Sequence, residues 1–375
     1  MKKLNKELLR QKIEAHMADD IADARIGGAT LIVNQDGERV YKGIFYDEKV
    51  GEVKEDTIYR LASMTKPVTA AAIMIARDRG LLDLDDTAAK YIPGFAEMNI
   101  GKLDENENPV FAEKAKAQIT IRQLLTHSSG LGSDTVGMKE WDRRPQQTRR
   151  ILEKATEFYT DTLLAFEPGT RQFYSPVMAF DTLGRIIEIV SGMSLGDFLE
   201  KEIFSPLGMN DTTFEPNAEQ WTRFIPMHNR VDDKAVIADV PANEVFCGVP
   251  VTCHCGGAGL ASTAEDYSKF AEMLLWGKGI LSPETLREMA TPQLPPEVMD
   301  GDQIWGLGMR VITQDTYKNL TTGSFGWSGA FGTHFWVDPV NRITAIYMKN
   351  SFYDGGAGSK TGYIFEGDVT ESLED

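Results

Sequence analysis

The stretch Leu61-Ala62-Ser63-Met64-Thr65-Lys66-Pro67 places a serine and a lysine where a helix is predicted to begin. Residues at this spacing are neighbours on a helix, so the amine of Lys66 would lie beside the hydroxyl of Ser63 and could take its proton. Pro67 is tolerated only in a first helical turn, which predicts a helix that begins between Ser63 and Lys66 and ends at Gly80. Ser63 would then lie at the positive end of the helix, where free amides stabilise an oxyanion.

The Ser-x-x-Lys pattern has a simpler alternative, in which the serine caps a helix and the lysine lies in solvent. A chain of this length contains about one such match by chance. The pattern therefore needs support from the rest of the chain.

The bulk composition is that of an ordinary globular protein. The chain has 375 residues, 42% of them hydrophobic and 25% charged, which is enough for a large core. A net charge of −17 would repel nucleic acid and anionic membranes, so neither is an expected partner. No apolar run is long enough to span a bilayer, and residues 1–7 are too charged for the start of a secretory signal. We therefore expect a cytoplasmic protein.

The three cysteines, Cys247, Cys253 and Cys255, do not make an even disulfide set. Cys253-His254-Cys255 could bind zinc with Cys247 or His228 as a further ligand, but no second spaced pair of ligands accompanies it. We expect reduced cysteines in a packed segment, and neither a metal nor an organic cofactor.

Strands are predicted near both ends of the chain. Residues 4–24 have the apolar spacing of an amphipathic helix, and Asp36-Gly37 is a hairpin turn signal. The predicted strands are Ala29–Val33, Val40–Tyr46, Phe331–Val337 and Ile343–Met348. A helix followed by a hairpin favours an antiparallel sheet covered by helices, and we expect the N- and C-terminal strands to share one sheet.

The middle of the chain, residues 61–255, has mainly helical patterns and long loops. Residues 101–118 and 132–150 are polar, and we expect them to wrap the surface as loops. Small residues at Gly256-Gly257-Ala258-Gly259 would allow close approach of two backbones. Ser262 and Thr263 then predict the cap of a helix that runs through Trp276.

Several stretches give Ser63 its context. In chain order they are Tyr59–Lys66, Leu81–Asp86 with Tyr91-Ile92-Pro93, Ile121–Leu131, Ser205–Met209 and Gly256–Asp266. Together they resemble the serine β-lactamase and penicillin-binding-protein superfamily, and the chain looks nearest to its class C β-lactamase-like branch, which includes the family VIII carboxylesterases. The resemblance implies an α/β fold of the α+β type, β-lactamase/transpeptidase-like, with an antiparallel sheet flanked by helices and a mostly helical lobe. Residues 1–60 with 256–375 would form the α/β lobe and residues 61–255 the helical lobe, with the active site between them.

The resemblance also implies a Tyr-x-Asn element, which here is Tyr174-Ser175-Pro176, preceded by Glu167-Pro168-Gly169. An ammonium such as that of Lys66 would favour the phenolate of Tyr174 and make it a usable base. The alternative is a core tyrosine with a satisfied hydroxyl. Pro176 stands where the family has asparagine, so a side-chain amide that binds a substrate carbonyl is missing. This weakens the case for amide or lactam substrates.

The third family element is a strand that carries Lys-Thr-Gly or a variant. A literal match at Lys360-Thr361-Gly362 lies in a glycine-rich tail after the last predicted strand, and we reject it as the site. Trp327-Ser328-Gly329 leads directly into a predicted strand and is the better counterpart. The resemblance then implies an oxyanion hole made by the backbone amides of Ser63 and Ala330, with Trp327, Ser328 and Gly329 in contact with substrate.

Trp327 in place of the family's lysine bears on the substrate. The lysine helps to bind the carboxylate of β-lactams and peptidoglycan stems, and such a charge-assisted hydrogen bond is worth about 1.5–3 kcal/mol. An indole offers an N–H and a large apolar face, which suit an uncharged acyl or alkyl group better.

His127, in Thr126-His127-Ser128-Ser129-Gly130, could be mistaken for the histidine of a catalytic triad. The family does not use it as the base, and we expect a structural role.

We therefore expect a serine hydrolase that acts through an acyl-enzyme on uncharged carboxylic esters, a carboxylesterase with a small-molecule substrate. Its catalytic residues would be Ser63, Lys66 and Tyr174. The alternatives are a β-lactamase or D-alanyl-D-alanine peptidase, an acyltransferase, and a non-catalytic scaffold on the same fold. Either Lys66 or Tyr174 could be the formal base, because their titrations would be coupled.

Overall fold

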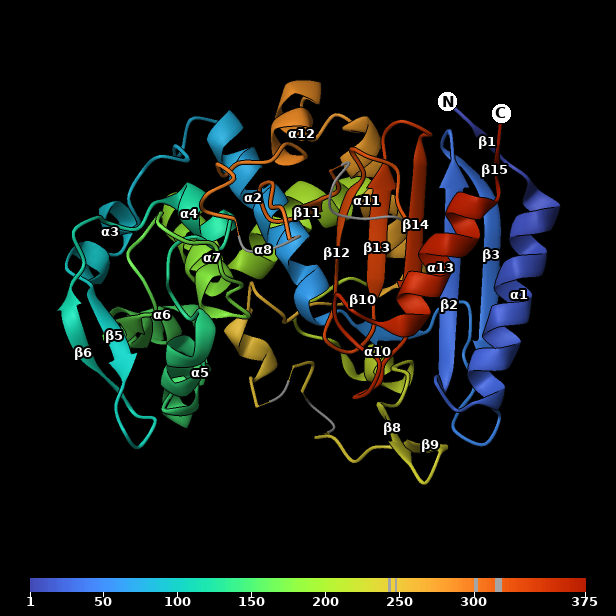
Figure 1. The fold of residues 1–375 in the computed structure, drawn as a ribbon, viewed down its shortest axis with the longest axis horizontal. Coiled ribbons are helices and arrows are strands. Elements are labelled where there is room, and N and C mark those ends of the chain that lie inside the picture. The colour runs from blue at the N-terminus through green and yellow to red at the C-terminus, as the bar shows by residue number, and fades with distance from the viewer. Residues whose placement is uncertain (242–243, 247, 300–302, 314–318) are drawn as a thin grey trace.

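A six-stranded antiparallel sheet organises the molecule (Figure 1). The structure is a computed structural model that describes residues 1–241, 244–246, 248–299, 303–313 and 319–375. The strand order is β11-β12-β13-β14-β2-β3. In the same order these strands are Arg310–Val311, Phe325–Ser328, His334–Asp338, Ile343–Met348, Gly28–Gln35 and Glu38–Tyr46. Strands from the two ends of the chain thus share one sheet, which confirms the prediction.

The β2–β3 hairpin is formed by the predicted turn. Asp36 and Gly37 both have positive φ, at 54° and 80°, as a two-residue hairpin turn with the right-handed twist of its strands requires. β14 pairs with β2 from Ile343–Gln35 to Met348–Thr30. The predicted strand from Phe331 begins only at His334, because residues 329–333 form the turn between β12 and β13.

Side chains alternate between two cores on the two faces of this sheet. On one face Leu31, Trp336 and Tyr347 pack with α1 (Lys6–Ala22) and α13 (Lys360–Glu371). On the other face Ile32, Phe335 and Ile346 belong to the largest core, which includes α11 (Ala264–Trp276). Thr263 caps α11 by accepting the amide of Asp266, so this predicted helix is confirmed.

The helices of the middle of the chain lie to the left of the sheet in Figure 1, except α10, which lies below the strands. They are α2 (Thr65–Asp78), α3 (Ala88–Tyr91), α4 (Ile121–Leu125), α5 (Asp134–Asp142), α6 (Leu152–Thr160), α7 (Met178–Ser191), α8 (Leu195–Leu199), α9 (Ser205–Leu207) and α10 (Ala218–Thr222). α12 (Pro283–Met289) follows α11. Short strands are β4 (Ile58–Arg60) paired with β10 (Ala261–Thr263), and the hairpin β8 (His228–Val231) with β9 (Lys234–Ile237).

Two segments predicted to wrap the surface as loops have regular structure instead, so the expectation of loops was wrong for both. Residues 101–118 contribute to a hairpin of β5 (Asn99–Leu103) and β6 (Pro109–Lys114), and β7 (Leu163–Leu164) pairs with β5. Residues 132–150 contain α5, which packs against this small sheet. Tertiary pairing supplies the stability that the polar sequences do not reveal.

The glycine-rich tail is also ordered. Lys360-Thr361-Gly362 forms the first turn of α13, and β15 (Leu373–Glu374) then pairs with β1 (Lys3–Leu4), which brings the two chain ends together. The buried Thr361 hydroxyl bonds to Asp354 at 2.7 Å. The literal Lys-Thr-Gly match therefore lies on a helix and not on a strand.

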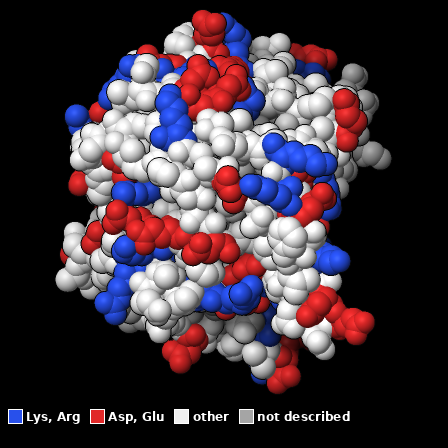
Figure 2. All heavy atoms as spheres, turned by 90° about the vertical axis from the view of Figure 1, so that its left-hand side faces the viewer, with Lys and Arg blue, Asp and Glu red and all other residues white. Residues whose placement is uncertain are grey.

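The surface mixes both signs of charge. On the face formed by the helical part, acidic and basic side chains alternate over short distances (Figure 2). None of the described helices is both long and apolar enough to cross a membrane.

Candidate active site

A tight turn presents Ser63 at the start of α2. β4 ends at Arg60, and Ala62 then takes a left-handed conformation with φ 46°, which is unfavourable for a residue with a side chain. A short 3₁₀ turn, Ala62–Met64, leads into α2, whose first turn holds Pro67 as predicted. Ser63 remains partly exposed, whereas Lys66 is fully buried. The turn thus exposes the hydroxyl and buries the amine beneath it.

Lys66 Nζ has three oxygen partners. It lies 3.2 Å from Ser63 Oγ, 2.6 Å from the carbonyl oxygen of Pro176 and 2.8 Å from that of Gly257. A carbonyl oxygen can only accept a hydrogen bond, so each of the two carbonyls takes one N–H of the amine. The third position on the nitrogen then points at Ser63. That third position is an N–H when the amine is charged and a lone pair when it is neutral, and the neutral form could take the serine proton.

The backbone at Gly257 is held in place to receive Lys66. Its amide donates to Asp181 Oδ1 over 3.2 Å, and Tyr159 donates its hydroxyl to the same carboxylate over 2.8 Å. A Cβ at Gly257 would lie 2.9 Å from Cα of Val177, which confirms the predicted close approach of this glycine segment. Sequence analysis missed Asp181. A carboxylate within the apolar run at the start of α7 could have indicated that Asp181 is buried and paired.

Tyr174 lies among aromatic rings next to Lys66. Trp327 donates its indole N–H to the Tyr174 hydroxyl oxygen over 3.2 Å, and Lys66 Nζ lies 5.0 Å from the phenol ring centre. The rings of His127, Trp327 and Trp305 have centres 4.6, 5.2 and 5.8 Å from that of Tyr174. Trp305 was not predicted. The structure therefore brings Ser63, Lys66, Tyr174 and Trp327 together in one continuous set of contacts. Ser328, which was predicted to contact the same substrate, bonds instead to His334 on the opposite face of the sheet, so that prediction was wrong for its side chain.

His127 is buried in this aromatic group. Its Nδ1 accepts the backbone amide of Ser175 over 3.1 Å. Burial, with a smaller contribution from the charge of Lys66, lowers the pKa of His127 well below its usual 6.5. The ring is therefore neutral and carries its proton on Nε2. It orients the segment that bears Tyr174, in keeping with the structural role predicted.

The turn between β12 and β13 packs against the start of α2. Thr333 donates its hydroxyl to the carbonyl oxygen of Leu61 over 3.0 Å, and a Cβ at Gly329 would lie only 2.2 Å from the same oxygen. Ala330 is exposed in this turn, and its amide donates no hydrogen bond to any residue that the structure describes. Glycine at 329 lets this free amide approach the Ser63 turn.

The cysteine segment is packed away from solvent. Cys253 and Cys255 are free and buried, and burial raises the pKa of the Cys253 thiol to about 12. Cys247 lies outside the described residues. Within the described ranges, no group of three or more His, Cys, Asp or Glu side chains is placed to hold a metal ion.

Fold and site together define a β-lactamase/transpeptidase-like protein, a mixed α/β fold with an antiparallel sheet. The chain belongs to the β-lactamase family, whose model matches residues 9–368. It is a member of the serine β-lactamase and penicillin-binding-protein superfamily near the family VIII esterases. The family includes hydrolases, as the relatives below illustrate.

Three similar proteins span most of the chain. Esterase EstB of Burkholderia gladioli is 27% identical, over 94% of this chain and 93% of its own. A putative D-alanyl-D-alanine carboxypeptidase of Escherichia coli is 27% identical, over 88% of this chain and 79% of its own. The solved structure of EstCE1, described as a hydrolase with promiscuous acyltransferase activity, has a TM-score of 0.79 at 22% identity and covers 97% of this chain and 99% of that one.

Proposed function

We propose that this protein is a carboxylesterase that forms an acyl-enzyme on Ser63. The observation that supports it most is the placement of Lys66 Nζ, 3.2 Å from Ser63 Oγ and 5.0 Å from the ring of Tyr174. An alcohol, an amine and a phenol thus share one site, and these are the groups needed to activate a serine. The esterase relative adds family-level support.

In the first step Lys66 and Tyr174 together take the Ser63 proton, and Oγ attacks the ester carbonyl. The amides of Ser63 and Ala330 would stabilise the tetrahedral oxyanion, a contribution of about 3–4 kcal/mol per donor in serine hydrolases. The intermediate expels the alcohol, which receives a proton from Tyr174. Tyr174 then activates water, and the acid leaves with Ser63 regenerated.

The preference for uncharged esters rests on two residues. Trp327 fills the position of the family's carboxylate-binding lysine with an indole that is buried and bonded to Tyr174. Pro176 offers Lys66 a backbone carbonyl, and its side chain has no donor for a substrate amide. Neither residue provides a charge for an anionic substrate.

The test uses intact-protein mass spectrometry after treatment with a fluorophosphonate, followed by peptide mapping. The first equivalent of label should map to Ser63, and Ser63→Ala should lose this label together with most of the turnover of p-nitrophenyl esters. Ser205→Ala, an exposed serine on α9, is the matched control and should behave as wild type. A first equivalent on another residue, or ester turnover undiminished in Ser63→Ala, would contradict the proposal.

An acyltransferase is a second candidate, since the structural neighbour EstCE1 is described with that promiscuous activity. Addition of an acceptor alcohol should reveal it as a new ester among the products. A β-lactamase or D-alanyl-D-alanine peptidase would hydrolyse nitrocefin well above its rate for short-chain p-nitrophenyl esters. A scaffold would show no turnover at all.

We also propose the two-lobe organisation and a cytoplasmic location. Residues 61–255 supply Ser63, Lys66 and Tyr174, whereas residues 256–375 supply Trp327 and Ala330, so the proposed site takes groups from both lobes. The free thiols of Cys253 and Cys255 fit a reducing compartment.

A further inference from the structure

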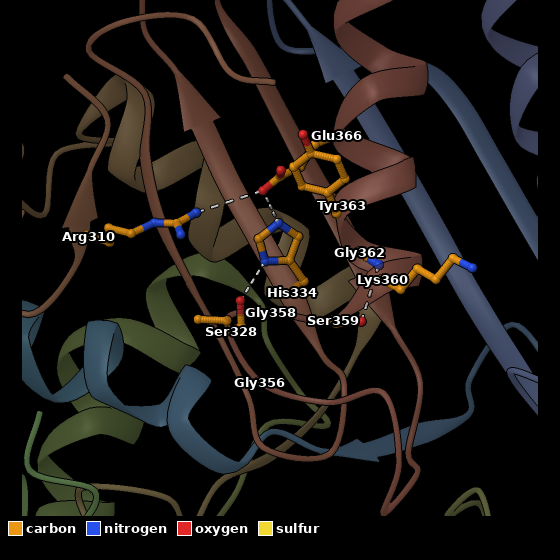
Figure 3. A pocket seen from close by; sticks show the side chains of 11 residues that line it. Arg310, Ser328, His334, Gly356, Gly358, Ser359, Lys360, Gly362, Tyr363 and Glu366 are labelled. Atoms are coloured by element: carbon orange, nitrogen blue, oxygen red, sulfur yellow. Dashed lines mark hydrogen bonds and ion pairs between the residues drawn. The ribbon is translucent and has the colours of Figure 1, made fainter. Parts of the chain in front are cut away.

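A second hydroxyl–imidazole–carboxylate chain lies on the sheet face that carries α13 (Figure 3). Ser328 Oγ is 2.8 Å from His334 Nδ1, and His334 Nε2 is 2.9 Å from Glu366 Oε1. Ser328 ends β12 and His334 begins β13, and the two are direct partners in the sheet register, so their side chains share a face. Glu366 reaches them from α13. Three separate elements thus build one linear chain.

The neighbouring groups determine which atoms of Ser328, His334 and Glu366 donate hydrogen bonds and which accept them. An ion pair with Arg310 at 3.8 Å supports Glu366 as a carboxylate, which can only accept a hydrogen bond. His334 therefore donates from Nε2, and in the neutral ring Nδ1 is the acceptor that faces the Ser328 hydroxyl. A neutral imidazole oriented by a carboxylate and hydrogen-bonded to a serine is the arrangement of a nucleophile and its general base. The ring uses its two nitrogens in the opposite order to the usual triad, but both roles are filled.

Ser328, His334 and Glu366 line a cavity of about 340 Å³. Ser328, His334 and Glu366 are 5%, 6% and 1% exposed, which keeps bulk water from the chain while leaving the hydroxyl at the cavity wall. Ala357 and Gly358 also line the cavity, and their backbone amides donate no hydrogen bond to any described residue. Free amides beside a serine are the donors that an oxyanion needs.

The hydrogen-bonded group of Ser328, His334 and Glu366 is separate from the proposed Ser63 site, because successive residues of a strand face opposite sides of the sheet. Trp327 belongs to the core on the α11 side and bonds to Tyr174. Its neighbour Ser328 faces α13, on the side where Trp336, two residues after His334, packs with α1 and α13. Lys66 and Tyr174 have no part in this second chain.

We propose that Ser328 is a second nucleophile, acylated by small esters that fit the cavity. Ser328 Oγ attacks the carbonyl while His334 Nδ1 takes the hydroxyl proton, and the tetrahedral intermediate then expels the alcohol, which receives that proton. Water attacks the acyl-Ser328 with His334 again as base, and the acid is released. Each cycle consumes one ester and one water and yields one alcohol and one acid.

The experiment is peptide mapping of a fluorophosphonate, in which a serine oxygen displaces fluoride from phosphorus. In Ser63→Ala, slower labelling should map to Ser328, and Ser63→Ala/His334→Gln should label about 10²-fold more slowly, the usual contribution of a general base. Ser63→Ala/Ser324→Ala is the matched control, since Ser324 is buried just before β12 with no hydrogen-bond partner for its hydroxyl among the described residues, and its labelling should equal that of Ser63→Ala.

Wild-type protein gives an independent readout that needs no variant to fold. Excess reagent should add a second equivalent, on Ser328, after the first has reacted at Ser63. No second equivalent, a second equivalent on another residue, or a labelling rate at Ser328 that is unchanged by His334→Gln would overturn the proposal. None of these outcomes alters where the first equivalent maps, so the proposed function is judged separately.

Discussion

Trp327 donates its indole N–H to the hydroxyl oxygen of Tyr174 over 3.2 Å, so the residue in the family's lysine position contacts the proposed base directly. The donor occupies one lone pair of the phenol oxygen and stabilises negative charge that develops there. It also turns the phenol's own hydrogen away from the indole. The tryptophan thus has an electrostatic role as well as an apolar surface.

Trp327→Phe keeps most of the ring surface but removes this donor. A neutral hydrogen bond is worth about 0.5–1.5 kcal/mol, so kcat for p-nitrophenyl acetate should fall about 2- to 12-fold. Steady-state kinetics check this, with Trp276→Phe as the control because it removes an indole N–H bonded to Glu272 on α11. An unchanged kcat in Trp327→Phe would show that the bond has no role in turnover.

Trp327→Lys should shift the preference toward substrates that carry a carboxylate. The ratio of nitrocefin turnover to ester turnover should rise by about 10-fold or more, given the strength of a charge-assisted hydrogen bond. The two kcat/KM values, measured side by side, decide the matter. A constant ratio would show that Trp327 does not determine the preference for uncharged substrates.

Tyr174→Phe should lower kcat about 10²- to 10⁴-fold, because it removes a proton-transfer group and leaves the ring packing intact. Stability should change little, since only the hydroxyl and its bond to Trp327 are lost. Ester kinetics and thermal unfolding together separate these effects. Tyr46→Phe is the control, as Tyr46 packs partly buried against the same core and should tolerate the change.

Gly329→Ala should damage stability and activity together. The new Cβ would meet the Leu61 carbonyl oxygen and the Thr333 hydroxyl, each at 2.2 Å, and would push the Ala330 turn away from Ser63. Overpacking of this kind costs about 1–3 kcal/mol. Gly367→Ala on α13, where the nearest atom to the new Cβ is Asn319 Nδ2 at 3.9 Å, should leave both properties nearly unchanged. Equal behaviour of the two variants in urea unfolding and ester kinetics would be inconsistent with the close approach described.

His127 should make the folded state less stable as the pH falls below about 6.5, the ordinary value for an exposed imidazole. Burial lowers the pKa of His127 in the folded protein, so in this range the unfolded chain binds a proton that the folded protein does not. The free energy of unfolding then falls by up to about 1.4 kcal/mol per pH unit from this residue. Urea unfolding at several values between pH 7 and 5 should show a shallower decline in His127→Gln. Parallel curves for the two proteins would contradict the buried neutral ring.

Local patterns predicted the elements whose signals are short. Ser63, Lys66 and Pro67 lie within one helical turn, and the Asp36-Gly37 turn needs only two residues with positive φ. The sheet shared by both ends followed from its strand patterns. The proposed roles at the site came from family resemblance, because spacing alone does not bring Tyr174 to Lys66.

What sequence analysis missed depends on tertiary contacts. The β5–β6 hairpin is held by β7 and α5, and the polar run at residues 104–108 between its two short strands makes the sequence look like a loop. The glycines before α13 obscured the apolar pair Phe365 and Val369, which lie one turn apart. Trp305 and the pair of His334 with Glu366 are recognisable only once distant segments have met.

The pairing of β2 with β14 has a consequence for biosynthesis. Asn34 and Thr344, joined by a hydrogen bond between their side chains at 3.0 Å, are 310 residues apart. At about 5–20 residues per second, the ribosome delivers the second strand roughly 15–60 s after the first. During that interval one edge of β2 has no partner strand, so it is open to pairing with another chain until β14 has been synthesised.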